Sequence, residues 1–274
     1  MFTLPPGWSE CNRLFSGARY TPAMAYAVPQ TIGDDLLDRV VALMNGDDQV
    51  DPFTLKSLKR EADKLQKVDA VRGSLVRSAI ASLEWDRDEA LRWSNNMLML
   101  EDNAATCFNA AISLRNSNDL KAAADFALRS YKHAPKNSTF AHHSANMLEM
   151  AGRLKEANAI LQSIEEKSPE MEEDYIASSE MLDAMKDIGI EESQLIDEIF
   201  IASELAAEKK IRIDFVAQGY DYDPNDGEGM YFVAIKVSVD FSKILELEEL
   251  LALRLSESER WSPLKLSVEF HVND

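Results

Sequence analysis

Histidine and carboxylate side chains are the residues of this sequence best suited to metal or acid-base chemistry. The histidines are His133, His142, His143 and His271. His142 and His143 are adjacent, so on a helix their side chains point about 100° apart and cannot share a metal ion as a pair four residues apart could. The loop after Asp221 begins like a calcium loop, but its twelfth position is Phe232, where a bidentate glutamate is required. We therefore expect no metal site and no cofactor.

Motifs of nucleophilic catalysis and of phosphate or dinucleotide binding are absent from the sequence: it has no G-x-S-x-G, no P-loop and no G-x-G-x-x-G. Among 48 carboxylates, pairs at some spacing are expected by chance, so pairing alone does not indicate catalysis. We expect a non-enzymatic protein. The alternative is an enzyme with its site in the C-terminal part, where the residues to inspect are Asp221, Asp223, Tyr231 and His271.

Charge is distributed unevenly along the chain. The formal net charge is −19, of which residues 1–160 carry −1 and residues 161–274 carry −18. Nucleic-acid binding depends on cations that neutralise phosphates, so this excess of acids disfavours nucleic acid as a partner. A basic stripe at helical spacing stands before the charge step; it comprises Lys56, Lys59, Arg60, Lys64 and Lys67. We expect these residues to form a solvated helix face. One alternative is contact with the acidic half, either within the chain or in a dimer. Another alternative is contact with RNA.

The sequence contains two cysteines, Cys11 and Cys107, which fits a reducing compartment without a disulfide framework. Residues 1–6 lack the cationic start and apolar run of a signal peptide, and no stretch reaches the ~18 apolar residues of a membrane span. These features predict a cytoplasmic protein without a membrane partner.

Helices must position any site in the first two thirds of the chain. Residues 1–31 are rich in proline and aromatic residues, which predicts an N-terminal arm. The 3.6-residue period of apolar residues then predicts helices over 32–68, the second of them from Pro52 to about Gln66.

An internal repeat follows. Residues 103–136 align with residues 137–170 at an offset of 34, with identities that include Asn103/Asn137, Ala111/Ala145, Ala123/Ala157 and Pro135/Pro169. Small residues fall where two helices of a hairpin approach closely, and proline falls where the second helix must stop. This period predicts stacked helical hairpins.

The repeat resembles the tetratricopeptide repeat family. Its small positions are Ala111, Ala123 and Ser130 in one unit and Ala145 and Ala157 in the next, where Ile164 departs from the pattern. A degenerate unit precedes them, with Ser78 and Ala90 in place but Asp102 instead of proline. The usual aromatic positions hold Cys107, Leu114, Ala141 and Leu148. The resemblance implies three repeats over 69–170.

The resemblance also implies a concave groove lined by the first helix of each unit. Its lining residues would be Ala105, Phe108, Ile112 and Arg115, then Thr139, His142, Asn146 and Glu149. We expect Phe108, Ile112, Arg115, His142, Asn146 and Glu149 to hold a partner segment. The alternative is a groove filled by the N-terminal arm or by a neighbouring helix of the same chain.

The remaining chain is expected to hold two capping helices over 171–210 and an acidic α+β domain over 211–274. In that domain a two-residue period of apolar positions predicts strands in the order β-β-α-β. The predicted fold class is mainly α, a tetratricopeptide-like helical-hairpin solenoid with a small C-terminal α+β domain.

An acidic surface completes the set of candidate sites. Its residues are Glu172, Glu173, Asp174, Asp183, Asp187, Glu191 and Glu192. One interpretation of these residues is a solvated helix face. The other is recognition of a basic protein, whose encounter with this surface would be steered electrostatically. The expected function is an adaptor that binds another protein or peptide, with a second copy of the chain as a further candidate partner. The alternative is an antitoxin, immunity protein or secretion-type chaperone that neutralises its partner.

Overall fold

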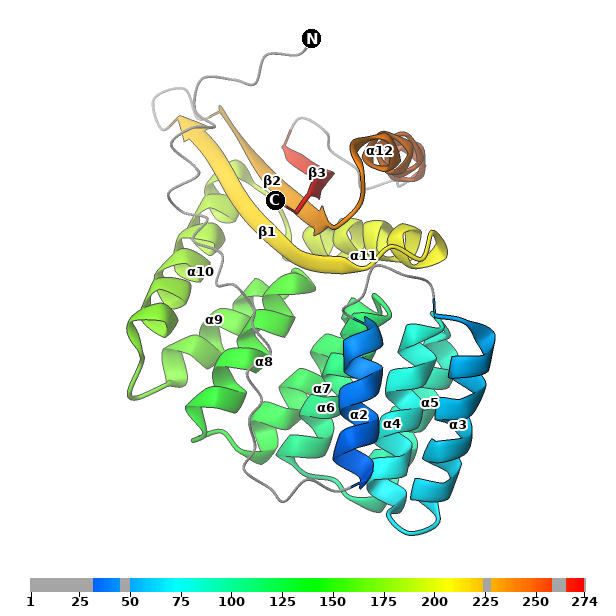
Figure 1. The fold of residues 1–274 in the computed structure, drawn as a ribbon. Coiled ribbons are helices and arrows are strands. Elements are labelled where there is room, and N and C mark those ends of the chain that lie inside the picture. Colours follow the sequence, from blue (N-terminus) through cyan, green and yellow to red (C-terminus); the bar gives the residue numbers. More distant parts are fainter. Residues whose placement is uncertain (1–31, 45–49, 224–227, 258–264, 274) are drawn as a thin grey trace.

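A computed structural model describes residues 32–44, 50–223, 228–257 and 265–273. The predicted N-terminal arm, with Cys11, lies outside these described residues. The described chain is mainly helical and carries a small three-stranded mixed sheet, as Figure 1 shows.

Antiparallel helix pairs build the N-terminal two thirds of the chain. The helices are α2 (Ile32–Met44), α3 (Pro52–Gln66), α4 (Ala70–Leu83), α5 (Arg87–Leu100), α6 (Ala104–Asn116), α7 (Leu120–His133), α8 (Ser138–Met150) and α9 (Leu154–Ser163). Each of α4, α6 and α8 packs against the helix that follows it. The predicted helix from Pro52 to about Gln66 is confirmed.

Helix caps recur with the same period as the sequence repeat. Asp69, Asn103 and Asn137 lie 34 residues apart and cap α4, α6 and α8, because each side chain accepts a hydrogen bond from a backbone N–H of the first turn. The turns that close these helices also recur: Trp85, Asn118 and Gly152 have left-handed backbones, with φ of 64°, 58° and 74°. The hairpins therefore start and turn at corresponding positions, a helical repeat-like architecture.

Small residues lie where the sequence repeat predicted close helix contacts. Ala111, Ala123, Ala145 and Ala157 are buried. The buried Ser130 of α7 donates a hydrogen bond from Oγ to the carbonyl of Ala104 in α6, at 2.8 Å. A larger side chain at these positions would push the paired helices apart.

Two longer helices follow the hairpins, α10 (Pro169–Ile188) and α11 (Glu192–Glu208). Gly189 ends α10 with φ of 79°, a left-handed conformation that glycine adopts without steric cost. Helix α10 packs against α9 and both long strands, whereas α11 packs against α7, α12 and β3. The two predicted capping helices thus also support the sheet.

The C-terminal elements are β1 (Ile213–Asp223), β2 (Glu228–Val237), α12 (Phe241–Ser256) and β3 (Leu266–Val272), in the predicted order β-β-α-β. Strand β2 is central: it pairs antiparallel with β1 and parallel with β3. Parallel neighbours need a crossover connection, which α12 supplies. Alternate residues of β2 are fully buried, from Tyr231 to Val237.

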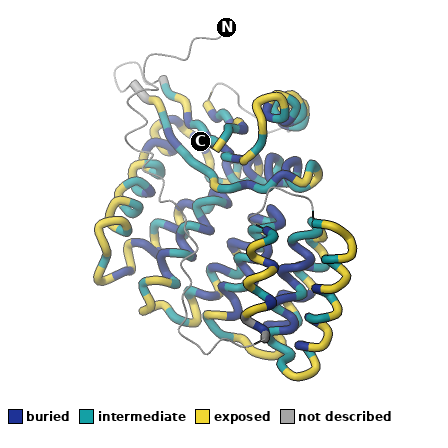
Figure 2. The backbone as a smooth tube through the Cα atoms, viewed as in Figure 1, coloured by how far each residue is buried: buried dark blue, intermediate teal, exposed yellow. Residues whose placement is uncertain are grey.

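The sheet shares its hydrophobic core with the helices. It lies against α8, α10 and α11, and one cluster of buried residues extends from Leu120 in α7 to Phe270 in β3. Figure 2 shows these buried residues on the inward sides of helices and strands. The predicted boundary at residue 211 therefore crosses a continuous core.

Asn118 fixes the start of the sheet unit on the hairpins. This fully buried residue lies in the turn between α6 and α7. Its Nδ2 donates to the carbonyl of Ile211 at 2.7 Å, and its Oδ1 accepts from the backbone N–H of Ile213 at 3.0 Å. One side chain thus pairs two backbone groups more than ninety residues away in sequence.

We expect Asn118→Gly to destabilise the protein by about 2–4 kcal/mol in urea-induced unfolding. Glycine keeps the left-handed turn but leaves the buried Ile211 carbonyl and Ile213 N–H without their partner. The matched control is Lys210→Gly, since Lys210 also has a left-handed backbone, with φ of 55°, but is exposed. That control should change stability by less than about 1 kcal/mol. Equal effects of the two substitutions would contradict a role for the Asn118 side chain.

Candidate functional site

The predicted partner groove is partly covered by strand β1 of the same chain. Arg115 of α6 donates a hydrogen bond from Nη2 to the carbonyl of Asp214, at the start of β1. Gln218, also on β1, donates from Nε2 to the carbonyl of Glu149 in α8, at 2.8 Å. At these positions the chain itself supplies the extended segment that the sequence analysis expected from a partner. Strand β1 therefore occupies this part of the predicted groove.

The other residues expected to hold a partner segment are also packed or half-buried, whereas the lining residues Ala105 and Thr139 are exposed. Phe108 is only 3% exposed; its ring stacks on His143 at 5.3 Å and meets Phe140 edge-on at 5.8 Å. Ile112 packs against a buried cluster of Ala111, Ala127 and Met147, and Asn146 is half-buried. Phe108 therefore acts as a packing residue rather than an exposed anchor.

Polar side chains meet at the junction of α8, α10 and the sheet. His142 lies 2.5 Å from Asp174, measured from Nε2 to Oδ2, and the Tyr231 hydroxyl donates to Gln218 Oε1 at 2.7 Å. Burial raises the pKa of Glu149 to about 8, and the charge of Asp174 adds to the shift. Burial, with the Glu149 charge, also raises the pKa of Tyr231. This junction brings together two predicted groove residues, one predicted acidic-surface residue and Tyr231.

One face of α10 carries an exposed row of carboxylates, which we call the acidic stripe: Glu172, Glu173, Glu180, Asp183 and Asp187. Residues 172, 176, 180, 183 and 187 follow helical spacing along one side of the helix. Ile176, within the stripe, is 48% exposed. Within the described part of the chain, no ion pair joins a stripe carboxylate to a cation. Figure 2 shows this outward side of α10 as exposed.

Three residues of the predicted acidic surface, Asp174, Glu191 and Glu192, do not belong to the stripe. Asp174 turns toward His142. Glu192 accepts a hydrogen bond from the backbone N–H of Lys155 at 2.7 Å and thereby ties α11 to α9. Glu191 is exposed next to Glu192, beyond the end of α10. The predicted surface is thus split between a solvated helix face and structural contacts.

The basic stripe lies on α3, as expected from its helical spacing. Lys56, Arg60, Lys64 and Lys67 are exposed, which agrees with a solvated face. Lys59 forms an ion pair with Glu84, the residue that follows α4, at 2.6 Å. Its partner lies in a neighbouring hairpin rather than in the acidic half of the chain.

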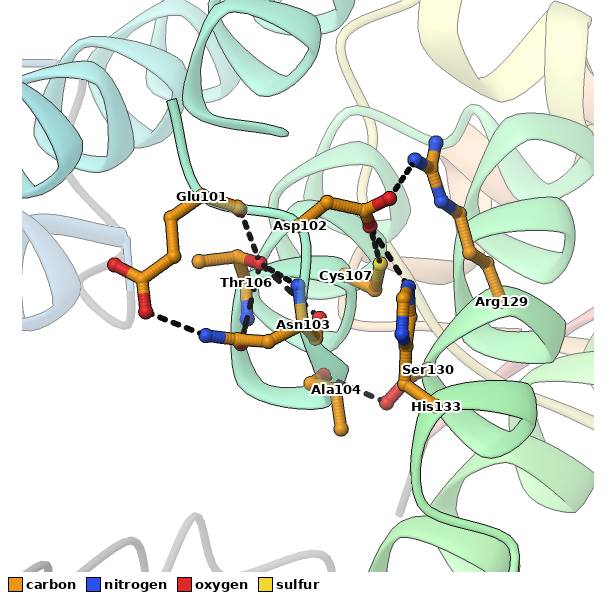
Figure 3. Close-up of polar contacts among 9 residues, drawn as sticks. All are labelled: Glu101, Asp102, Asn103, Ala104, Thr106, Cys107, Arg129, Ser130 and His133. Carbon is orange, nitrogen blue, oxygen red and sulfur yellow. Dashed lines mark hydrogen bonds and ion pairs between the residues drawn. The ribbon is translucent and has the colours of Figure 1, made fainter. Parts of the chain in front are cut away.

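A second polar group, which we call the Asp102 cluster, joins the loop between α5 and α6 to the end of α7 (Figure 3). It comprises Asp102, Cys107, Arg129 and His133. Asp102 Oδ2 accepts from Arg129 Nη2 at 2.5 Å, and Asp102 Oδ1 lies 2.8 Å from His133 Nε2 and 3.5 Å from Cys107 Sγ. The hydrogen bond from Arg129 lowers the pKa of Asp102, and burial raises the pKa of the Cys107 thiol to about 12.

Sequence analysis did not group the residues of the Asp102 cluster. Cys107 and His133 lie on different helices, and no short motif contains both. The one sequence feature that pointed to this cluster is Asp102 itself, because it stands where the repeat pattern has proline.

The residues named for an enzymatic alternative are not brought together. Tyr231 pairs with Leu266 at the start of β3, whereas His271 is five residues further along that strand, or about 16 Å at 3.3 Å per residue. Asp221 is exposed on β1. The side chain of Asp223 and most of the calcium-like loop lie outside the described residues.

No protein-family model, curated protein or solved structure matches the sequence significantly. Among the described helices, none combines the length and apolar character needed to cross a membrane.

The raised pKa of Glu149 predicts a stability that falls as pH rises. Its pKa is about 8 in the folded protein and about 4.3 when unfolded, so between these values the folded state binds more protons. We expect Glu149→Gln to unfold only slightly above the wild-type temperature at pH 5 and on the order of 10 °C above it at pH 8.5, because glutamine never ionises. Thermal unfolding followed by circular dichroism across this range measures the difference.

The control for this substitution is Glu165→Gln, at an exposed carboxylate. It should leave the pH profile of the melting temperature unchanged. Wild type and Glu149→Gln profiles that run parallel from pH 5 to 8.5 would contradict a raised pKa of Glu149.

Proposed function

We propose that this protein is a non-enzymatic protein–protein interaction adaptor that binds a basic segment of its partner through the acidic stripe of α10. The observation that carries this proposal is the stripe itself: five exposed carboxylates on one helix face, without a cation from the described chain paired to them. A partner with Lys and Arg at matching spacing would supply the missing counter-charges.

We also propose that the helical hairpins form a tetratricopeptide-like solenoid. Helix caps and left-handed turns that recur every 33 or 34 residues support this proposal, as do the buried small residues between paired helices. In such an array each hairpin supports the next one, so α9 holds α10 in place with its outward face in solvent.

The contacts of β1 favour the stripe over the groove as the partner surface. Arg115 and Glu149 are already hydrogen-bonded to β1, so a peptide would have to displace the strand to reach them. The stripe requires no such displacement. It extends over about 22 Å, at 1.5 Å per residue from residue 172 to residue 187, which suits a helical segment of several turns. Ile176 offers an apolar contact within it.

The same chemistry supports a narrower role for the adaptor. A dedicated acidic partner that neutralises a basic protein, as an antitoxin, immunity protein or secretion-type chaperone does, would use the stripe in the same way. The two roles differ in whether binding blocks an activity of the partner. We place either role in the cytoplasm, because the free thiol of Cys107 suits a reducing compartment.

Charge reversal of the stripe provides the test. The full chain should bind a fluorescein-labelled peptide that repeats Lys-Leu-Lys-Lys, measured by fluorescence anisotropy, and should not bind the same peptide with Glu in place of Lys. We expect the triple variant Glu172→Lys, Glu180→Lys, Asp183→Lys to lose affinity at least about tenfold. Binding should also weaken as salt rises from about 0.05 to 0.5 M, because exposed charges are screened.

The matched control carries the same charge change elsewhere. Asp38, Glu249 and Glu257 are exposed carboxylates outside α10, and replacing all three by Lys should lower affinity less than about threefold. Equal losses in the two triple variants would mean that the peptide responds to net charge alone, and would overturn the stripe as the binding surface.

A further inference from the structure

Three potential metal ligands converge on one point in the Asp102 cluster. The ligand atoms offered by Asp102, Cys107 and His133 all lie within 4.8 Å of one another. Two of them approach the same oxygen: His133 Nε2 is 2.8 Å from Asp102 Oδ1, and Cys107 Sγ is 3.5 Å from it. A thiolate, an imidazole and a carboxylate oxygen form a donor set that zinc accepts.

The spacing of these atoms is close to that of a zinc site. Bond lengths of about 2.3 Å to sulfur and about 2.0 Å to nitrogen or oxygen, in a tetrahedral arrangement, separate neighbouring ligand atoms by roughly 3.3–3.6 Å. The sulfur–oxygen distance already lies in this range. The distance from His133 Nε2 to Asp102 Oδ1 must increase by about half an ångström. A small rotation of the partly exposed His133 side chain can provide this movement.

Arg129 is placed to orient the Asp102 carboxylate for metal binding. Its Nη2 donates to Asp102 Oδ2, the oxygen that neither His133 nor Cys107 approaches. This bond holds the carboxylate with Oδ1 facing the other two ligands. Carboxylate ligands of metal sites are commonly held by a hydrogen bond of this kind.

We propose that Asp102, Cys107 and His133 bind one zinc ion, with the fourth coordination position open to solvent. The side chains of Asp102 and His133 are 40% and 33% exposed, so an ion can enter beside them although Cys107 is buried. Sulfur among the ligands favours zinc over magnesium or calcium, which prefer oxygen alone.

The bound ion would join the α6–α7 hairpin at one end. Asp102 precedes α6, Cys107 lies in its first turns and His133 is the last residue of α7. Binding to the folded chain but not to the unfolded chain raises the melting temperature. This role is separate from the acidic stripe, which lies on α10.

Cobalt and zinc titrations of the full chain test the proposal. After removal of metal with a chelator, Co²⁺ should produce thiolate-to-cobalt charge-transfer absorption that saturates at one equivalent, and Zn²⁺ should abolish it and raise the melting temperature. Cys107→Ser should remove the charge-transfer band, and His133→Asn should weaken Zn²⁺ binding at least about tenfold. Cys11→Ser and His271→Asn are the matched controls and should bind as the wild type does.

The variants also separate zinc binding from a plain hydrogen-bond network. His133→Asn, at a partly exposed position, keeps the test valid if Cys107→Ser fails to fold, which its circular dichroism melt reveals. Absence of the charge-transfer band in the wild type, or Zn²⁺ affinity unchanged in His133→Asn, would overturn the site and leave an Asp102–Arg129–His133 hydrogen-bond network only.

Discussion

Docking of the three-stranded sheet on the helical hairpins is the contact on which the other features of this protein depend. Backbone groups that become buried when a sheet docks must find hydrogen-bond partners. Here the Asn118 side chain hydrogen-bonds the carbonyl of Ile211 and the N–H of Ile213. Arg115 donates a hydrogen bond to the carbonyl of Asp214. The apolar face then packs into one core with α7 to α11. Helices and sheet are thereby stabilised together.

This docking determines which surfaces remain for a partner. Strand β1 is hydrogen-bonded to Arg115 and to the carbonyl of Glu149 in α8, so these predicted groove positions are already in contact with the same chain. Helix α10 is held between α9 and the sheet, with one face inward and the acidic stripe outward. The proposed function therefore rests on an outward helix face rather than on a groove.

Carboxylates at two helix junctions of this fold lie in different environments, and their pKa values shift in opposite directions. At the junction with the sheet, desolvation raises the pKa of Glu149, which favours the neutral, protonated form of its carboxyl group. In the Asp102 cluster the carboxylate stays near solvent and is held by Arg129, which lowers its pKa and leaves one oxygen facing His133 and Cys107. Solvation and the nearest charge, rather than residue type, decide which of the two can serve as a ligand.

The amino-acid sequence determined the local features: the helix from Pro52 to Gln66, the 34-residue period of Asn103 and Asn137, and the order β-β-α-β. Apolar periodicity and helix capping act between residues a few positions apart, so they can be read without the fold. Only the tertiary structure decided that β1 contacts Arg115 and Glu149, that the pKa of Glu149 is raised and that Asp102, Cys107 and His133 meet. Those contacts join residues separated by up to about a hundred positions, and their partners are set by how whole elements pack, which no local pattern encodes.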